Sequence, residues 1–295
     1  MVSVDVVIVS YNSRHQLHDC VKPLLELPSV HVTVVDNASP DASIEAVQGL
    51  PLSAIQLPTN GGFASGVNAG WRAGSAPYVL LLNPDARIDG PSIDALVRAL
   101  EEDPAIGAVA PLIVDADGSL DYSQRRFPRL RSTYAQAIFL HRFFPTASWS
   151  DELIRDEQAY ASRGNPDWVS GACMLLRRTA LEELGGLDEG FFMYSEDVDL
   201  CRRLRSAGYE LLFEPAAVVQ HEGGASAPRT HLLPVLAASR IRYAAKHRSS
   251  AAAFLERAGI ALGSLTHVAV ARGGVAARAG HARALRFAVT RPSQS

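Results

Sequence analysis

The run VDVVIVS at residues 4–10 decides the first element of the fold, because a short, nearly continuous β-branched apolar run is typical of a strand buried on both faces. Similar runs follow within the first 115 residues: HVTVVD at 31–36, AIQLP at 54–58 and YVLLLNPD at 78–85. Helical patterns separate these runs, near 14–27, from about 41, and from the glycine-rich turn at 60. This βαβαβ alternation predicts an α/β fold, a doubly wound and mostly parallel sheet with helices on both faces.

Polar side chains stand where these strands end. They are Ser10, Tyr11 and Asn12 after the first strand, Asp36 and Asn37 after the second, and Asn83 and Asp85 after the fourth. Sheets of this kind bind ligands at the carboxyl ends of their strands. We therefore expect these residues to line one crevice.

The second half of the chain is less regular. It offers a helix at 92–102, strands at GAVAPLIV (107–114), WVSGACMLLRR (168–178) and LLFEPAAVVQH (211–221), and helices beyond His221. Between them, residues 121–166 mix arginines with the apolar run AIFLHRFF. This segment is either a lid or acceptor-binding insertion, or simply a surface excursion of the chain. The sequence alone does not distinguish between these alternatives.

Composition favours a soluble globular protein, with 47% hydrophobic and 20% charged residues. The three cysteines, Cys20, Cys173 and Cys201, form no CxxC pair and are odd in number, so neither a disulfide framework nor a zinc ribbon is indicated. Met1 leads directly into the first strand without a signal-peptide pattern. We expect a cytoplasmic location.

Charge is divided unevenly along the chain. Residues 229–295 contain 11 Lys and Arg against one acidic residue, whereas residues 1–228 contain 17 against 30. Such a basic block favours an anionic partner, a membrane surface or nucleic acid, although a solvated tail is the simpler alternative. Its most apolar stretch, residues 258–271, is shorter than the roughly 20 residues that span a bilayer. It is either an amphipathic segment at an anionic leaflet or a helix packed on the catalytic domain.

Asp85 is the first candidate for chemistry. A carboxylate that ends an apolar strand projects into the crevice, where it can hold a divalent cation against a diphosphate. Asn, Pro and Asp also favour turns, so the NPD sequence alone has a structural explanation.

Three further residues are candidates later in the chain. Glu196 and Asp197 precede a helical pattern, so either can be a helix cap or a general base. His221 follows a strand and is followed by glycines, which suits a metal ligand, a phosphate contact or a structural histidine.

The glycine-rich stretch NGGFASGVNAGW at 60–71 resembles a phosphate-binding turn before a helix, but it is not GxGxxG. Close packing of a helix on the sheet explains its glycines equally well. No GxxxxGK[ST] motif is present, which excludes P-loop ATPases.

Taken together, VSYNS, VVDNASPD, NGGFASGVNAG, LLLNPDA, GACML, FFMYSEDVDLCRRLRSAGY and the late His221 resemble the rhamnosyltransferase-like enzymes of glycosyltransferase family 2. The resemblance covers about residues 3 to 225. It is greatest to enzymes that add L-rhamnose to N-acetylglucosaminyl diphosphate polyprenol in cell-wall linker synthesis. It implies a GT-A fold, with a nucleotide-binding half at 1–115, an acceptor-binding half at 116–228 and a basic helical extension at 229–295.

The resemblance also implies roles for single residues. Asp85 and His221 would bind Mg or Mn, Asp197 would be the catalytic base, and Glu196 would orient the acceptor. The nucleotide-sugar donor would contact Ser10, Tyr11, Asn12, Asp36, Asn60, Gly62, Asn83, Gly171 and Ala172. The reaction would invert the anomeric carbon in a single displacement.

One departure from the family pattern is informative. Many GT-A enzymes carry two carboxylates in a DxD motif, whereas this chain has Asn83, Pro84 and Asp85. Mg and Mn prefer several oxygen ligands, so the diphosphate and water must supply the others. We therefore expect metal binding to depend on the donor.

Other functions remain open from the sequence. The same fold and mechanism could use a UDP-linked sugar, and a nucleotidyltransferase is the nearest different enzyme. Outside enzymes, a binding or scaffold protein that has lost catalysis and a basic nucleic-acid binder are the alternatives; few aromatics are interleaved in the basic tail, which disfavours the latter. The expected partners are a dTDP- or UDP-sugar, a polyprenyl diphosphate-linked acceptor and the inner face of the cell membrane, with homo-oligomers open.

Overall fold

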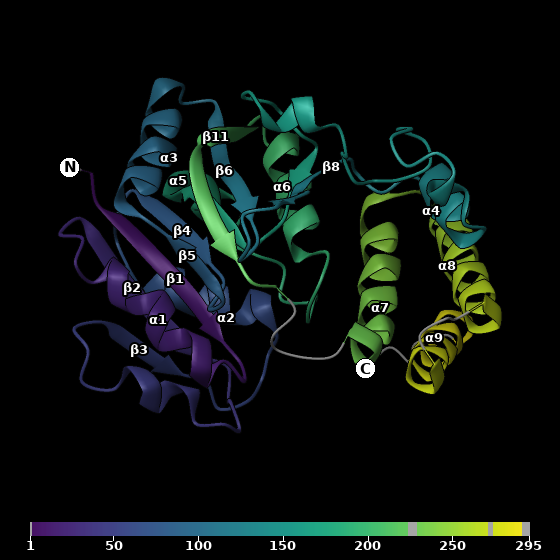
Figure 1. The fold of residues 1–295 in the computed structure, drawn as a ribbon, viewed down its shortest axis with the longest axis horizontal. Helices are drawn as coiled ribbons and strands as arrows, with labels where there is room; N and C mark the ends of the chain where they lie inside the picture. Colours follow the sequence, from purple (N-terminus) through teal and green to yellow (C-terminus); the bar gives the residue numbers. More distant parts are fainter. Residues whose placement is uncertain (1, 224–228, 271–273, 291–295) are drawn as a thin grey trace. The chain divides into compact units, whose positions relative to one another are not determined.

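The computed structural model describes residues 2–223, 229–270 and 274–290, and the chain divides into two compact units (Figure 1). The α/β unit comprises Met1–Arg125, Asp156–Gly190 and Glu196–Ser226. The helical unit comprises Arg126–Arg155, Phe191–Ser195 and Ala227–Ser295. The extension expected at 229–295 thus forms one body with residues 126–155, although its residues 271–273 and 291–295 lie outside the described part.

The α/β unit is built on a nine-stranded sheet with the order β3-β2-β1-β4-β10-β6-β11-β5, and β7 pairs with β6. Its strands are β1 (Val4–Ser10), β2 (Val30–Asp36), β3 (Ser53–Gln56), β4 (Tyr78–Leu82), β5 (Ala86–Ile88), β6 (Ile106–Val114), β7 (Leu120–Asp121), β10 (Cys173–Arg177) and β11 (Glu210–His221). A separate two-stranded sheet joins β8 (Gln124–Arg125) and β9 (Trp168–Val169).

Parallel pairing is confined to part of the sheet. Strand β1 pairs in parallel with β2 and β4, and β2 with β3, as the βαβαβ rhythm predicts. In the second half, β10 runs antiparallel to both β4 and β6, and β11 runs antiparallel to β5 while parallel to β6. The α/β fold class is confirmed, and the sheet as a whole is mixed because of these antiparallel pairs. The segment WVSGACMLLRR, expected as one strand, is two strands separated by residues 170–172.

The helices of this unit are α1 (Arg14–Leu24), α2 (Phe63–Ala73), α3 (Gly90–Glu102), α5 (Arg178–Glu183) and α6 (Glu196–Ser206), with short 3-10 helices η1 (Ser43–Val47) and η3 (Glu157–Tyr160). The helix expected from about Asp41 is wrong, because η1 is only a 3-10 segment. The Asp41 carboxylate accepts hydrogen bonds from the Ser43 amide and hydroxyl, at 3.1 and 2.5 Å, and Ala42 has φ 56°. This local turn competes with an α-helix.

Side chains alternate between the two faces of β1. Val6 and Ile8 belong to the core that α1 and α3 cover. On the other face, a Cβ added to Gly66 would lie 2.5 Å from Val9 Cγ1, and one added to Gly70 would also clash with Val7. Helix α2 therefore packs on the sheet through its glycines, in agreement with the packing interpretation of the glycine-rich stretch.

The helical unit contains α4 (Leu130–Ala137), α7 (Arg229–His247), α8 (Ser250–Val270) and α9 (Gly274–Val289), with the 3-10 helix η2 (Leu140–Arg142). Gly259 of α8 lies against Thr133 and Tyr134 of α4, and Gly280 of α9 lies against Thr230 of α7. The helical pattern expected beyond His221 is confirmed in the described residues. Across these residues, every helix is too short or too polar to cross a bilayer.

Candidate active site

The ends of β1 and β2 present two buried polar groups. Ser10 is fully buried, and Asp36 is almost so. Asp36 Oδ2 accepts a hydrogen bond from the Ser39 amide at 3.2 Å, whereas Asp36 Oδ1 and Ser10 Oγ have no partner among the described residues. Buried polar atoms are nearly always hydrogen-bonded, so unpaired ones at strand ends indicate a place for a ligand.

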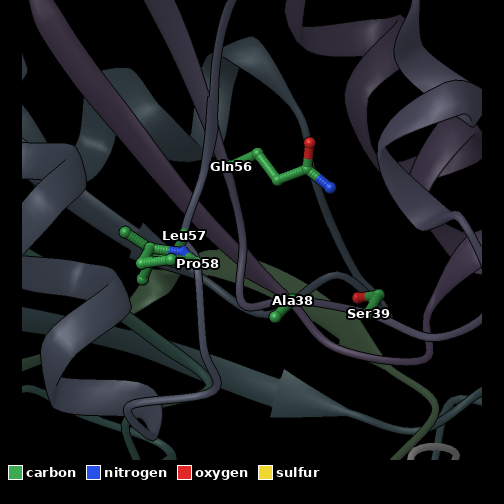
Figure 2. A pocket seen from close by; sticks show the side chains of 5 residues that line it. All are labelled: Ala38, Ser39, Gln56, Leu57 and Pro58. Carbon is green, nitrogen blue, oxygen red and sulfur yellow. The ribbon is translucent and has the colours of Figure 1, made fainter.

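An open pocket of about 460 Å³ lies beside these groups, between the residues that follow β2 and those that follow β3 (Figure 2). It is lined by Ala38, Ser39, Gln56, Leu57 and Pro58. Asn12 is exposed nearby, with φ 55° and its amide donating to Ser39 Oγ at 3.3 Å, and Tyr11 is half-buried. The volume falls within the range of small-molecule sites.

Asn37 connects this edge to the glycine-rich turn. Its Nδ2 donates to the Gly62 carbonyl at 2.9 Å, and its Oδ1 accepts from the Gly61 amide at 3.1 Å. Asn60 Oδ1 accepts from the Gly62 amide at 3.0 Å, and Gly62 has φ 86°, a left-handed conformation that favours glycine. Asn60 and Gly62 therefore shape the start of α2 at the edge of the crevice.

Asp85 and His221 meet although they lie far apart in the sequence. The end of β11 pairs antiparallel with β5, which sets His221 opposite Ala86. His221 Nε2 lies 3.2 Å from Asp85 Oδ1 and 3.3 Å from Asn83 Nδ2. Strand β5, which the sequence analysis missed because it is only a short run after NPD, is thus the element that brings the pair together.

Electrostatics favours the charged forms of the pair. Burial by itself would raise the pKa of Asp85, but the hydrogen bond and charge of His221 bring that pKa below its ordinary value. Burial would lower the pKa of His221, but Asp85 above all, then Asp121 and Glu222, raise it above its ordinary value. A metal ion would compete with a proton for this histidine.

The donor set fits a weakly held divalent cation. One carboxylate, one imidazole and the amide of Asn83 converge, and the described residues contain no group of three or more His, Cys, Asp or Glu arranged for a metal. Mg and Mn bind oxygen-rich sites and often keep water and phosphate ligands. Two side-chain ligands, Asp85 and His221, would leave the other positions around such an ion to a diphosphate and water.

Asp197 lies at the start of α6 and is tied to the sheet. Its Oδ2 accepts a hydrogen bond from the Gly171 amide at 3.2 Å, and its Oδ1 accepts from the Val198 amide at 2.8 Å. A Cβ on Gly171 would lie 3.4 Å from Asp197 Cβ and 3.8 Å from a ring carbon of Phe63. The carbonyl of the next residue, Ala172, accepts a hydrogen bond from the backbone amide of Asn83 at 2.9 Å.

Protein atoms enclose Asp197 closely, and this burial raises the pKa of its carboxyl above the ordinary value. Hydrogen bonds from Val198 and Gly171 and the charge of Arg125 act in the opposite direction. A carboxylate with a raised pKa is a better proton acceptor at neutral pH, as a general base requires.

Arg125 is a residue that the sequence analysis did not assign to the site. It belongs to β8, stands opposite Trp168 in β9, and its guanidinium carbon lies 5.1 Å from the centroid of that ring. Its buried Nε has no hydrogen-bond acceptor in the part of the chain that the structure describes. In the sequence, Arg125 is only one of several arginines that follow a polar run, and that is too weak a signal to assign it to the site.

Glu196 is buried as the first residue of α6, so it is not a solvent-exposed helix cap. The two residues before it, Tyr194 and Ser195, both have φ 67°, which is strained for residues with side chains. Asp199 pairs with Arg203 at 2.7 Å, which gives this third carboxylate a structural role. Glu196 and Asp197 remain the two candidates at this helix start.

Comparisons with known proteins identify relatives of this chain. The chain is 39% identical over 220 residues to the N-acetylglucosaminyl-diphospho-decaprenol L-rhamnosyltransferase of Mycobacterium tuberculosis, covering 69% of this chain and 71% of that protein. It is 31% identical over 150 residues to the rhamnosyltransferase WbbL of Escherichia coli, covering 50% and 52%.

Two solved structures share the fold. The mannosyltransferase PcManGT from Pyrobaculum calidifontis, in complex with GDP-Man and Mn2+, has a TM-score of 0.57 at 19% identity, covering 98% of this chain and 81% of that one. TarS residues 1–349 of S. aureus, in complex with UDP, has a TM-score of 0.53 at 13% identity, covering 97% and 89%. The likeness confirms a GT-A-like α/β fold. Since the family description "Glycosyltransferase like family 2" matches residues 3–245, the chain belongs to that family and is a glycosyltransferase.

Proposed function

We propose that this glycosyltransferase moves L-rhamnose from dTDP-L-rhamnose to a hydroxyl of N-acetylglucosaminyl diphosphate polyprenol, in the synthesis of cell wall or polysaccharide at the inner face of the cell membrane. The names of the M. tuberculosis and E. coli relatives support the sugar, and the former supports the acceptor. The chemistry rests on this chain's own residues.

The observation that carries the proposal is the short connection between Asp85 and Asp197. Asn83, two residues before Asp85, donates its amide to Ala172, and the adjacent Gly171 donates its amide to Asp197. The Asp85–His221 pair and the half-buried Asp197 therefore belong to one hydrogen-bonded framework at the ends of β4 and β10. The Asp85–His221 side of this framework can contact the leaving diphosphate, and the Asp197 side can contact the acceptor hydroxyl.

In this mechanism, Asp197 accepts the proton of the acceptor hydroxyl as the oxygen attacks the anomeric carbon. The new carbon–oxygen bond forms while the bond to the diphosphate breaks, and the bonding electrons leave with the diphosphate. The attack comes from the side opposite the leaving group, so the anomeric configuration inverts without a covalent enzyme intermediate. Glu196 orients the acceptor, and Gly171 and Ala172 face the donor sugar.

The nucleotide binds at the other end of the crevice. The unpaired Asp36 Oδ1 and Ser10 Oγ are suited to accept and donate hydrogen bonds to the base or ribose. Tyr11, Asn12, Asn60 and Gly62 complete the pocket. Asp85 and His221, with Asn83 beside them, hold Mg or Mn, which when bound offsets the charge that develops on the diphosphate.

A donor panel tests the proposal. Purified protein is incubated with dTDP-L-rhamnose or with UDP-linked sugars, together with the lipid-linked acceptor, and the released nucleotide and the glycolipid are separated by chromatography. We expect dTDP release with a product of inverted configuration by NMR. Preference for a UDP-sugar would replace the donor, and release of pyrophosphate from a nucleoside triphosphate would indicate a nucleotidyltransferase instead.

Metal binding is tested separately by calorimetry. Because a single carboxylate anchors the ion, we expect weak Mn binding to the free protein and a clear increase when dTDP is present. Asp85→Asn should remove the increase, whereas Asp94→Asn, an exposed carboxylate on α3, should not. Tight Mn binding without nucleotide would contradict the reduced metal motif.

A further inference from the structure

The helical unit keeps all of its acidic side chains inside. It contains 16 Lys and Arg but only three acidic residues, Asp151, Glu152 and Glu256, whose side chains are 11%, 7% and 1% exposed. Acidic side chains are normally found on the surface. The exterior of this unit therefore presents no carboxylate side chain to oppose its basic ones.

Arginines inside the unit neutralise these acids. Arg240 lies 2.6 Å from Glu152 and 3.0 Å from Glu256, and Arg248 lies 2.9 Å from Glu256. Asp151 pairs with Arg155 at 3.1 Å. Other basic residues are exposed on the outside of the unit, including Arg131, Arg142, Arg278, Arg283 and Arg286. The net positive charge of the helical unit is therefore carried by its surface.

Helix α8 buries polar residues and exposes apolar ones. Its buried residues are Glu256, Gly259 and Ser264, whereas Phe254 is 70% and Leu265 is 55% exposed. The outward positions 254, 258, 261, 265 and 269 are Phe, Ala, Ala, Leu and Ala, a stripe at helical spacing without a polar side chain. The 21-residue helix is about 30 Å long. The stripe, from residue 254 to residue 269, covers about 22 Å of this length, and an exposed apolar stripe is unfavourable in water and favours an apolar partner.

A second exposed apolar group adjoins α8. Phe143 is 77% exposed, and Ile138, Phe144 and Trp149 are also exposed, in the segment 138–149 that we call the aromatic segment. Phe139 of this segment stacks on His267 of α8, with ring centroids 4.6 Å apart. Arg142 lies over the Phe139 ring at 4.4 Å. Aromatic and arginine side chains together are typical of segments at a membrane interface.

We propose that the helical unit binds an anionic phospholipid bilayer through the outward stripe of α8 and the aromatic segment. The stripe lies at the boundary between headgroups and acyl chains, with the helix parallel to the surface, and the acid-free exterior attracts anionic headgroups. This names the membrane partner and revises the region expected to bind it, because residues 138–149 act together with the tail. It rests on the proposed function only in that a polyprenyl acceptor lies in such a bilayer.

Charge and chemistry favour a bilayer over other occupants. A second copy would bring two surfaces of like positive charge together, which opposes association. Nucleic acid would use the arginines but would leave the Phe254 and Leu265 stripe exposed, since phosphate contacts dominate such binding. Anionic lipid matches both the charge and the apolar stripe.

Flotation of the full chain with vesicles tests the proposal. We expect it to float with phosphatidylcholine vesicles that contain phosphatidylglycerol, much less with phosphatidylcholine alone, and less as salt is raised. The double variant Phe254→Gln/Leu265→Gln should reduce partitioning at least about tenfold, since each side chain buries apolar area in the interface. Arg142→Gln should reduce it about fivefold.

The matched control is Val218→Gln on β11, an exposed apolar residue of the α/β unit, which should float as wild type. Circular dichroism checks that each variant is folded. Turnover with a water-soluble, short-chain acceptor should be unchanged in the α8 variant, so loss of flotation is separable from failure of the proposed reaction.

Three results would overturn the proposal. The first is failure of the wild type to float with anionic vesicles, and the second is flotation of the folded α8 variant to the same extent as wild type. The third is elution of the wild type as a dimer that Phe254→Gln/Leu265→Gln converts to a monomer without any vesicle binding, which would assign the stripe to a second copy.

Discussion

The α/β unit contains 28 acidic and 12 basic residues, whereas the helical unit contains three and 16. In the α/β unit, carboxylates such as Asp36, Asp85 and Asp197 stand at strand and helix ends, where they can meet a ligand. In the helical unit, the acids lie among the packed helices, paired with Arg155, Arg240 and Arg248, and other arginines are exposed. We therefore expect carboxylates of the α/β unit to act in binding and catalysis, whereas those of the helical unit serve internal packing, because the strand ends of the sheet open into a crevice.

The largest effect is expected from Asp197→Asn in the α/β unit. The substitution keeps the size of the side chain but removes the proton acceptor, so transfer should fall about a hundredfold to ten-thousandfold while donor affinity is retained. Steady-state turnover and calorimetric titration with the nucleotide sugar measure the two quantities. Asp94→Asn serves as the exposed control, and near-normal turnover of Asp197→Asn would move the base to Glu196 or to neither.

In the helical unit, the corresponding variant is Arg240→Met, which leaves Glu152 buried without its cation and Glu256 with Arg248 alone. Removing one partner from a buried ionic group typically costs about 3–5 kcal/mol of unfolding free energy. Urea unfolding followed by circular dichroism measures the loss. Arg283→Met on α9 is the exposed control, and equal stability of the two variants would show that the internal acids are not held by Arg240.

One glycine substitution in each unit should have a smaller effect on stability, and the two should differ in sign or size. Gly66→Ala on α2 places a Cβ 2.5 Å from Val9 Cγ1, so overpacking should lower stability by about 1–3 kcal/mol. Gly263→Ala on α8 places its Cβ 3.4 Å from Ala137 Cβ, an ordinary contact, and should be neutral or stabilising by up to about 1 kcal/mol. Thermal unfolding of both variants decides the matter; a harmless Gly66→Ala would mean that α2 can move away from β1.

The pH dependence should show the smallest change. Because burial raises the pKa of Asp197, the base is lost by protonation as pH falls through that raised value, so activity should rise as pH increases through it and level off above it. Arg125→Gln removes a cation that lowers this pKa, so the acid limb of the kcat profile should move to higher pH. Arg98→Gln, exposed on α3, is the control. An acid limb that stays at the same pH in Arg125→Gln would show that Arg125 does not influence the pKa of the base.

Much of the fold could be read from the sequence where local pattern and tertiary environment agree. Strands β1, β2 and β4 are buried on both faces, so their apolar runs are continuous, and they were located to within a few residues. The short strand β5 and the division into β9 and β10 could not be found, because runs of two to five residues carry no periodicity. The η1 segment was misjudged for a different reason, since Asp41 and Ala42 favour a local turn.

For the site, the sequence supplied the residue types, and their joint function stays a prediction. Asp85, His221 and Asp197 were chosen as strand-end and helix-start residues, and the resemblance to glycosyltransferases gave them roles. Arg125 was not chosen, because its relation to Asp197 depends on the pairing of β8 with β9. A pairing between segments more than forty residues apart leaves no local trace.

The sequence by itself determined the family, the α/β alternation and the strand-end polar residues, because these follow from local hydrophobic pattern and ordered motifs. Tertiary structure alone decided that β11 returns antiparallel to β5 and so joins His221 to Asp85. It also decided that residues 126–155 pack with the tail and that α8 turns Glu256 inward and Phe254 outward. The reason is physical: which side of a helix is buried depends on its neighbours, and here buried arginines make the charged side the inner one.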